Sequence, residues 1–199
     1  MGLATLAMIP PAILAYSARE MHIARSFFYL SILFLTIVAM ISCATHQRHR
    51  RSDARAQLIT LFSAFGALPV MLAVPFHQGL QTTSFVNAYF EMVSSLTTTG
   101  ATLFDDPERL SDALHLWRGL VGWLGGLLIW VVAGAILSPL NLGGYEVATA
   151  RDASRVGARF AQIYESQSSQ DRVMRAFWMI GPIYTGLTIG LAALILADG

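Results

Sequence analysis

Five stretches of this 199-residue chain contain no Asp, Glu, Lys or Arg. Each is at or near the ~20 residues that a helix needs to cross a hydrocarbon core of ~30 Å. They cover most of a chain in which 55% of the residues are hydrophobic and 13% are charged. The sequence therefore predicts an all-α membrane protein with about five transmembrane helices. The stretches are Met1–Ala18, Ser26–Thr45, Ala56–Phe90, Gly119–Tyr145 and Ala176–Ala197.

Charge and cysteine content exclude several classes of protein. The thirteen cationic residues are all Arg and nearly balance twelve acidic residues, so a net charge of +1 gives no reason to expect nucleic acid as a partner. Cys43 is the only cysteine, which excludes a disulfide framework and a CxxC metal or redox motif. The chain also lacks GxSxG, HExxH and paired membrane aspartates, so we expect no enzymatic activity.

Clusters of Arg determine the expected orientation of the helices. By the positive-inside rule, two Arg-rich segments lie in the cytoplasm and the acidic segment 105–112 lies outside. Counting back places the N-terminus in the cytoplasm, with Arg19 and Arg25 in a short external turn. The first stretch could instead be a signal peptide, but its start lacks the positive charge of such signals. The clusters are Arg48, Arg50, Arg51 and Arg55, and then Arg151, Arg155 and Arg159.

The stretch Ala56–Phe90 has 35 residues, which is too long for one helix and too short for two that cross the membrane. Leu58–Phe76 suffices for one outward span, with a bend expected at Pro69 and Pro75. The residues after this span must therefore belong to a different kind of element.

The sequence pattern after this span, from residue 83 to residue 102, predicts a short helix followed by a loop. Thr83 or Ser84 can cap a helix that runs to Leu96, and Thr97–Thr102 breaks the helical pattern. At ~1.5 Å per residue, this helix reaches ~20 Å and cannot cross the membrane. Because the residues on either side are expected outside, the segment must enter the membrane and return to the same face. We therefore expect a re-entrant pore helix and filter loop.

A Thr-Thr-Thr-Gly loop at membrane depth implies a polar pathway. Irregular backbone survives there only where it is buried in protein or lines a water-filled cavity. Consecutive carbonyl oxygens can replace the hydration shell of a cation, and a short helix directs its negative C-terminal end toward the same site. Gly100 can take a positive φ because it has no Cβ. The alternative is that Thr97–Thr102 is only a polar external turn.

The residues around this loop resemble a known family. The resemblance is to the Trk/Ktr/HKT potassium transporters, in particular to the first pore loop of the bacterial Trk membrane subunit and to the helix that follows it. The matching motifs are Phe90-Glu91, Ser94-Ser95-Leu96-Thr97-Thr98-Thr99-Gly100-Ala101-Thr102, Trp117-Arg118, Trp123-Leu124-Gly125-Gly126 and Gly143-Gly144.

This resemblance implies both an activity and an architecture. Such transporters have four joined helix–pore loop–helix repeats around one pathway, after a leading helix pair. They carry potassium as substrate, without a cofactor, across the bacterial inner membrane. The ion-binding filter residues that the resemblance implies are Thr97, Thr98, Thr99, Gly100 and Ala101.

The resemblance also divides the chain. A leading helix pair (1–45) and a cytoplasmic basic loop (46–57) precede the first helix–pore loop–helix repeat (58–140). A cytoplasmic linker (141–171) and the first helix of a second, incomplete repeat (172–199) follow. Because a ring of filter carbonyls needs four contributions and this chain supplies one, we expect a fragment that needs further repeats or further copies. The alternatives are a homo-oligomeric cation channel and a truncated membrane protein that conducts nothing.

Two charged residues are expected to support the filter. Glu91 lies in the pore helix and Arg118 lies near the external end of the next span, and a charge at membrane depth indicates a functional site. We expect the two to approach each other, so that exchanging both charges restores function lost in either single exchange. The alternative is that Arg118 extends to the outer interface while Glu91 contacts water.

Two further patterns concern packing and partners. Small residues recur on one face of the fourth stretch and permit close helix contact: Gly119, Gly122, Gly125 and Gly126. The Arg residues at 151, 155 and 159 recur every four residues and predict an amphipathic cytoplasmic helix that lies in solvent or on lipid headgroups. The resemblance implies instead a contact there with a cytoplasmic nucleotide-binding regulatory subunit, and a homodimer for the full-length protein.

Overall fold

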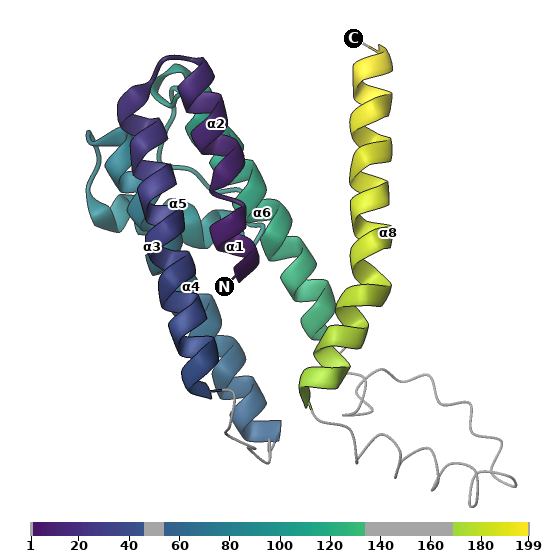
Figure 1. The fold of residues 1–199 in the computed structure, drawn as a ribbon. Helices are drawn as coiled ribbons and strands as arrows, with labels where there is room; N and C mark the ends of the chain where they lie inside the picture. Colours follow the sequence, from purple (N-terminus) through teal and green to yellow (C-terminus); the bar gives the residue numbers. More distant parts are fainter. Residues whose placement is uncertain (1, 46–53, 134–168, 199) are drawn as a thin grey trace, which may run out of the picture. The chain divides into compact units, whose positions relative to one another are not determined.

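The computed structural model describes residues 2–45, 54–133 and 169–198. These ranges contain helices and no strand, and three helical segments are long and apolar enough to span a membrane: Met21–Ala44, Asp112–Val132 and Val173–Asp198. The protein is therefore an all-α membrane protein, as the sequence predicts. Its elements are α1 (Gly2–Leu6), α2 (Ile9–Ser17), α3 (Met21–Thr45), α4 (Ala54–Leu80), α5 (Phe85–Leu96), the 3₁₀ turn η1 (Pro107–Arg109), α6 (Asp112–Val132) and α8 (Ser169–Asp198) (Figure 1).

The chain divides into two units. The first consists of Met1–Arg51 with Leu58–Gly126, and the second of Ser52–Gln57 with Leu127–Gly199. In the second unit, α8 continues through Pro182 over 30 residues, seven residues longer at its start than the stretch beginning at Ala176. All the predicted filter residues and both charged supports belong to the first unit.

The first predicted span, Met1–Ala18, is broken in the structure. α1 and α2 are separate short helices, because Pro10 and Pro11 lack the N–H groups that would bond back to the end of α1. Gly2–Ser17 is accordingly a shorter apolar helical segment, below the length of a spanning helix. The structure therefore divides this predicted span into two short helices.

A tight turn folds α2 back onto α3 as a helical hairpin (Figure 1). The backbone N–H of Arg19 donates to the Tyr16 carbonyl at 3.1 Å, and that of Glu20 donates to the Ala15 carbonyl at 2.9 Å. This is the Schellman pattern, and Arg19 takes the positive φ (62°) that it requires. Of the two Arg residues predicted in this turn, Arg19 lies there, whereas Arg25 lies in the second turn of α3. Small buried residues of α1 and α2 allow close packing on the buried stripe of α3: Ala4, Ala12 and Ala15, and then Ile23, Ala24, Phe27 and Leu30.

Helices α3, α4 and α6 meet around Trp117. Its indole N–H donates to the Leu72 carbonyl of α4 at 3.2 Å, and its ring lies edge-on to Phe27 of α3 with centroids 5.4 Å apart. α4 runs through both Pro69 and Pro75 as one helix, and it is longer at both ends than the predicted 58–76. The buried side chain of Trp117 thus connects α3, α4 and α6 in the core of the unit.

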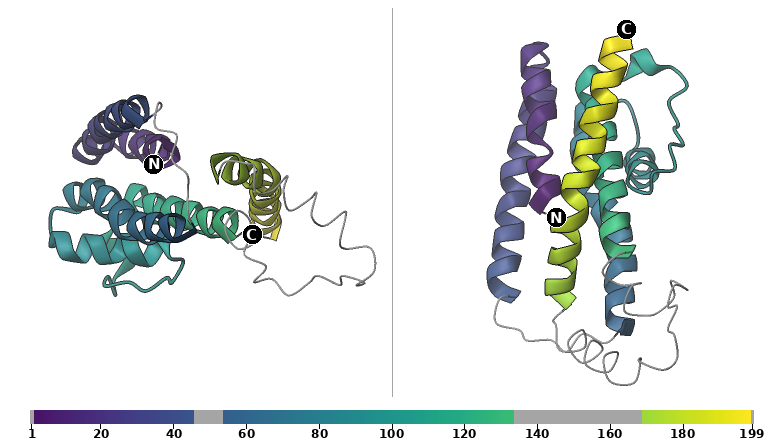
Figure 2. Two further views of the ribbon diagram at one scale, coloured as in Figure 1. Left: turned by 90° about the horizontal axis from the view of Figure 1, so that it is seen from below. Right: turned by 90° about the vertical axis from the view of Figure 1, so that its right-hand side faces the viewer.

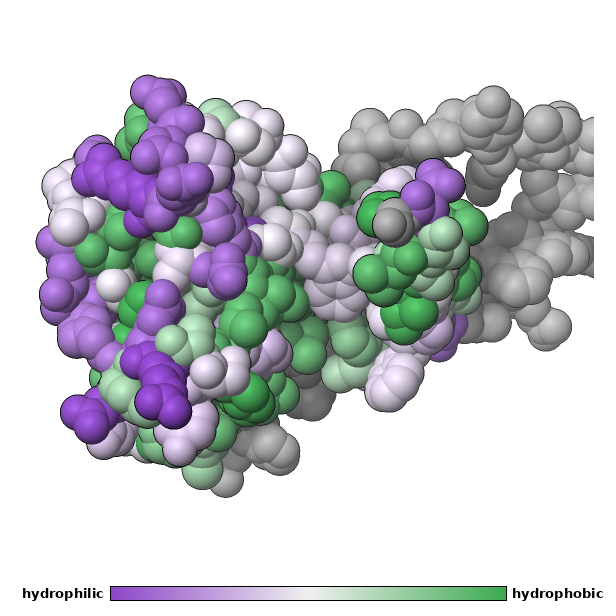
Figure 3. Space-filling model, turned by 90° about the horizontal axis from the view of Figure 1, so that it is seen from above, coloured by the Kyte–Doolittle hydropathy of each residue, from purple (hydrophilic) through white to green (hydrophobic). Residues whose placement is uncertain are grey.

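α5 runs across the long helices instead of alongside them, as the two views in Figure 2 show together with Figure 1. The loop after α5 then returns to η1 and to the start of α6. Figure 3 views the molecule from the end where α3 begins and α4 ends, and it shows hydrophilic residues gathered there. The exposed polar residues of these turns and loops include Arg19, Gln81, Asp105, Asp106, Glu108 and Arg109.

Candidate functional site

The candidate site begins with the short helix α5. The Ser84 side chain accepts a hydrogen bond from the Asn87 N–H at 3.2 Å and caps the N-terminus, and the helix ends at Leu96. The residues from Thr97 to Thr102 are not helical. The predicted cap, short helix and non-helical loop are therefore confirmed, and 12 residues give α5 a length of ~18 Å.

The loop starts with a helix-terminating motif that carries an unusual residue. The N–H of Thr98 donates to the Ser95 carbonyl at 3.0 Å, and the N–H of Thr99 donates to the Ser94 carbonyl at 2.9 Å. These are the two hydrogen bonds of a Schellman motif, whose left-handed position is usually Gly. Here Thr98 occupies it with φ at 57°, a conformation that costs a β-branched residue about 1–2 kcal/mol.

The polar side chains of the loop bond to the loop itself. The Thr97 hydroxyl donates to the Val93 carbonyl at 2.8 Å and lies 2.8 Å from the Thr99 hydroxyl. The Ser94 hydroxyl donates to the Ala101 carbonyl at 2.6 Å, across the base of the loop. These bonds connect the loop to the end of α5 at both of its ends, through Thr97 at its start and Ala101 near its end.

The main-chain carbonyls of the loop divide into two groups. Ala101 has its carbonyl bonded to Ser94, whereas the carbonyls of Thr97, Thr98, Thr99 and Gly100 accept no hydrogen bond from the described residues. Gly100 has φ at 76°, and a Cβ placed on it would meet no atom within 4 Å. A glycine is therefore favoured at position 100 by the backbone conformation and not by lack of space for a side chain.

Glu91 of α5 holds the segment Thr102–Leu103, by which the chain leaves the loop. Its side chain is fully buried, and Oε1 accepts hydrogen bonds from the Thr102 hydroxyl at 2.9 Å and from the Leu103 N–H at 2.5 Å. The N–H of Phe104 in turn donates to the Thr102 hydroxyl at 3.2 Å. One carboxylate oxygen thus fixes the segment by which the chain leaves the loop.

The other carboxylate oxygen of Glu91 pairs with Arg118. Arg118 Nη2 of α6 lies 3.2 Å from Glu91 Oε2, so the predicted approach of the two residues is present. The geometry is that of an ion pair without a hydrogen bond, because Glu91 Oε2 and Arg118 Nε have no hydrogen-bond partner in the described structure. With 0% and 21% of the side chains exposed, the two charges have lost most of their solvent and depend on each other.

Glycines of α6 allow the end of α5 to approach closely. A Cβ on Gly125 would overlap the Leu96 carbonyl group, and a Cβ on Gly122 would lie 3.5 Å from the Ser95 carbonyl oxygen. Nothing lies within 4 Å of a Cβ on Gly119. The predicted close packing is therefore present at Gly125 and does not extend to Gly119.

Sequence reasoning missed two members of this site. Ser94 and Thr102 belong to the matching motif but had no expected role, and both connect α5 to the loop: Ser94 bonds to Ala101, and Thr102 bonds to Glu91. The predicted Arg-rich segment at 48–51, the linker from 141 and its Arg residues at 151, 155 and 159 lie outside the described residues.

The region that contains α5, the loop and α6 is also the region in which this chain is similar to known proteins. A profile of the family TrkH, described as cation transport protein, matches residues 23–181. The Trk system potassium uptake protein TrkI of Halomonas elongata is 48% identical over 82 residues, which are 41% of this chain and 15% of that protein. Over 152 residues, the Trk system potassium uptake protein TrkG of Escherichia coli K12 is 31% identical, with 70% of this chain and 29% of that protein covered.

The TrkH protein of Halomonas elongata is a third such relative, 39% identical over 105 residues. In each case the chain spans less than a third of the relative's length. The family profile, in contrast, covers well over half of this chain and includes α5, the loop and α6. The chain therefore belongs to the TrkH family of cation transport proteins.

Proposed function

We propose that this chain forms part of a potassium uptake transporter of the inner membrane, in which the ion passes the loop Thr97–Ala101. The relatives described above carry potassium uptake in their names. The observation that carries the proposal is the set of carbonyls from Thr97 to Gly100 that accept no hydrogen bond from the described chain. Free carbonyls on an otherwise bonded loop are the ligands that a dehydrated potassium ion requires.

The field of α5 favours a cation at the same place. A helix carries about half a negative charge at its C-terminal end, and α5 ends directly before Thr97. The N–H groups of Thr98 and Thr99 bond to the Ser95 and Ser94 carbonyls and offset part of this charge, and the remaining dipoles of α5 still end next to the loop. An ion at the loop would therefore meet both main-chain dipoles and the end of the helix.

We assign Glu91 and Arg118 as positioning residues for this loop. Glu91 holds Thr102 and Leu103 and so fixes where the outgoing limb lies. A buried carboxylate without a counter-charge would cost several kcal/mol and would also attract the passing cation. Arg118 neutralises it, which leaves the carbonyls as the ion ligands.

One loop supplies one part of a coordination shell, so the proposal needs further loops. These come from further repeats of a longer protein or from further copies of this chain. The resemblance to Trk transporters also leads us to propose an N-terminus in the cytoplasm, a homodimer of the full-length protein, and a cytoplasmic nucleotide-binding regulatory partner.

The test is ion selectivity in a full-length transporter that carries this segment, expressed in cells deficient in potassium uptake. Gly100→Ser should lower potassium uptake or relax discrimination against sodium, because a side chain at φ 76° strains the loop. Gly119→Ser is the matched control, since it adds the same side chain in open space on α6. Unchanged rate and selectivity in Gly100→Ser would overturn the proposal.

A further inference from the structure

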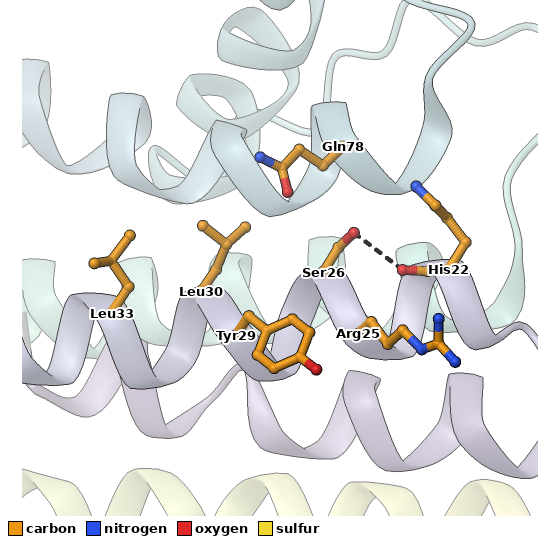
Figure 4. A pocket seen from close by; sticks show the side chains of 7 residues that line it. All are labelled: His22, Arg25, Ser26, Tyr29, Leu30, Leu33 and Gln78. Atoms are coloured by element: carbon orange, nitrogen blue, oxygen red, sulfur yellow. Dashed lines mark hydrogen bonds between the residues drawn. The ribbon is translucent and has the colours of Figure 1, made fainter.

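A groove of about 410 Å³ lies between α3 and α4 in the first unit, remote in sequence from the loop. Figure 4 shows Ser26, Leu30 and Leu33 of α3 pointing toward α4, which carries Gln78, while Tyr29 and Arg25 of α3 point away from Gln78. It is lined by His22, Arg25, Ser26, Tyr29, Leu30 and Leu33 of α3 and by Gln78.

The lining changes from polar to apolar along α3. His22, Arg25 and Ser26 lie in the first turns of the helix, and Leu30 and Leu33 follow toward its middle. From residue 22 to residue 33 the groove follows ~16 Å of helix. Half of a ~30 Å hydrocarbon core is about the same length. Since α3 is a candidate membrane span, we expect the polar groups of the groove near the membrane interface and its apolar groups among the acyl chains of one leaflet.

Arg25 is the charged residue of the groove, and it has no ion pair with any described residue. It lies inside a candidate membrane span, where an unpaired cation is costly unless it reaches an anion or water. The rim beside it is polar and held in place: Ser26 donates to the His22 carbonyl at 3.0 Å, and the His22 ring lies 2.7 Å from the Gln81 amide nitrogen. The groove thus offers a cation on a fixed polar rim.

We propose that this groove binds one anionic phospholipid. Its phosphate would lie against Arg25 and the polar rim, and one acyl chain would lie along Tyr29, Leu30 and Leu33. Arg25 is complementary in charge to the phosphate. A free phosphate ion would leave the apolar side chains of Leu30 and Leu33 uncovered, whereas an acyl chain covers them. A helix of a second copy would need an acid opposite Arg25, whereas a phospholipid has both parts in one molecule. The proposal does not depend on which ion the protein transports.

The experiment measures retention of defined lipids by the purified chain in native mass spectrometry. The probes are phosphatidylglycerol, phosphatidylcholine and inorganic phosphate. Phosphatidylglycerol should be retained in preference to the other two. Arg25→Gln should weaken its apparent affinity about fivefold, the effect of one cation near a membrane surface. Arg25→Lys should retain it, and so distinguishes loss of charge from loss of fold.

Two variants test the place of the lipid. Leu33→Trp fills the apolar half and should weaken retention without changing the charge. Arg19→Gln removes an exposed cation at the same end of the hairpin, outside the groove, and should have no effect. Equal retention by Arg25→Gln and the original chain, or binding of inorganic phosphate as tight as that of the lipid, would overturn the proposal. A second copy retained in place of lipid would overturn it as well.

Discussion

The backbone of Gly125 in α6 lies directly against the carbonyl group of Leu96, the last residue of α5. A Cβ on Gly125 would lie 2.9 Å from the Leu96 Cα and would overlap its carbonyl oxygen. The obstacle is main chain and cannot move aside as a flexible side chain could. Gly125→Ala should therefore push α5 away from α6 and shift the loop that begins at Thr97.

The expected cost of Gly125→Ala is about 1–3 kcal/mol of stability, the usual range for overpacking. The thermal unfolding midpoint of the purified protein should fall, and uptake by the full-length transporter should fall with it. Gly119→Ala is the control, because its Cβ would be in open space and alanine favours a helix by ~1 kcal/mol over glycine. Equal midpoints for the two variants would contradict the close contact.

The pair of Glu91 and Arg118 is better tested by neutral variants than by the exchange of charges that the sequence suggests. An Arg at position 91 cannot accept the hydrogen bonds of Thr102 and Leu103, so the exchange should fail even though the pair exists. Glu91→Gln retains one acceptor oxygen for these hydrogen bonds and removes the charge, with an NH2 group in place of the second oxygen. Either Glu91→Gln or Arg118→Gln should destabilise the protein, because a fully buried Glu91 or a partly buried Arg118 then remains without its partner, and the loss should be larger for Arg118→Gln.

The double variant Glu91→Gln/Arg118→Gln should lose less stability than the two single losses added together. A coupling of about 0.5–3 kcal/mol is expected for charges in contact. It can be read from thermal or denaturant unfolding of the four proteins in the same detergent. Strict additivity would mean that the 3.2 Å approach contributes nothing to stability.

Thr98 should respond to substitution in the opposite direction. With φ at 57°, Thr98→Gly should relieve strain and raise stability by about 1 kcal/mol. The same change at Thr99, which has a negative φ and a hydroxyl 2.8 Å from that of Thr97, should lower stability. If Thr98→Gly is more stable and also less selective for potassium, the strained threonine serves the filter. A lower thermal unfolding midpoint for Thr98→Gly than for the original protein would show that Thr98 is not strained at this φ.

The sequence predicted the parts of this site that depend on local rules. Capping by Ser84, the end of α5 and the positive φ of Gly100 follow from residue type and near neighbours. The bonds of Ser94 to Ala101 and of Glu91 to Leu103 could not be predicted, because they depend on the path by which the loop returns. The break after α1 was missed although Pro10 and Pro11 were visible, since composition alone suggested an unbroken span.

Residues 1–199 expressed alone should enter the membrane but should not restore growth of potassium-uptake-deficient cells at low potassium. The reason is a count of ligands: in the proposed pathway the carbonyls from Thr97 to Gly100 would form one side of a shell, and a single side does not offset the dehydration of the ion. Copies of the chain could complete the ring only if α8 found a place outside each repeat. Strong potassium uptake by this chain, lost in Gly100→Ser but not in Gly119→Ser, would establish a homo-oligomeric pore instead.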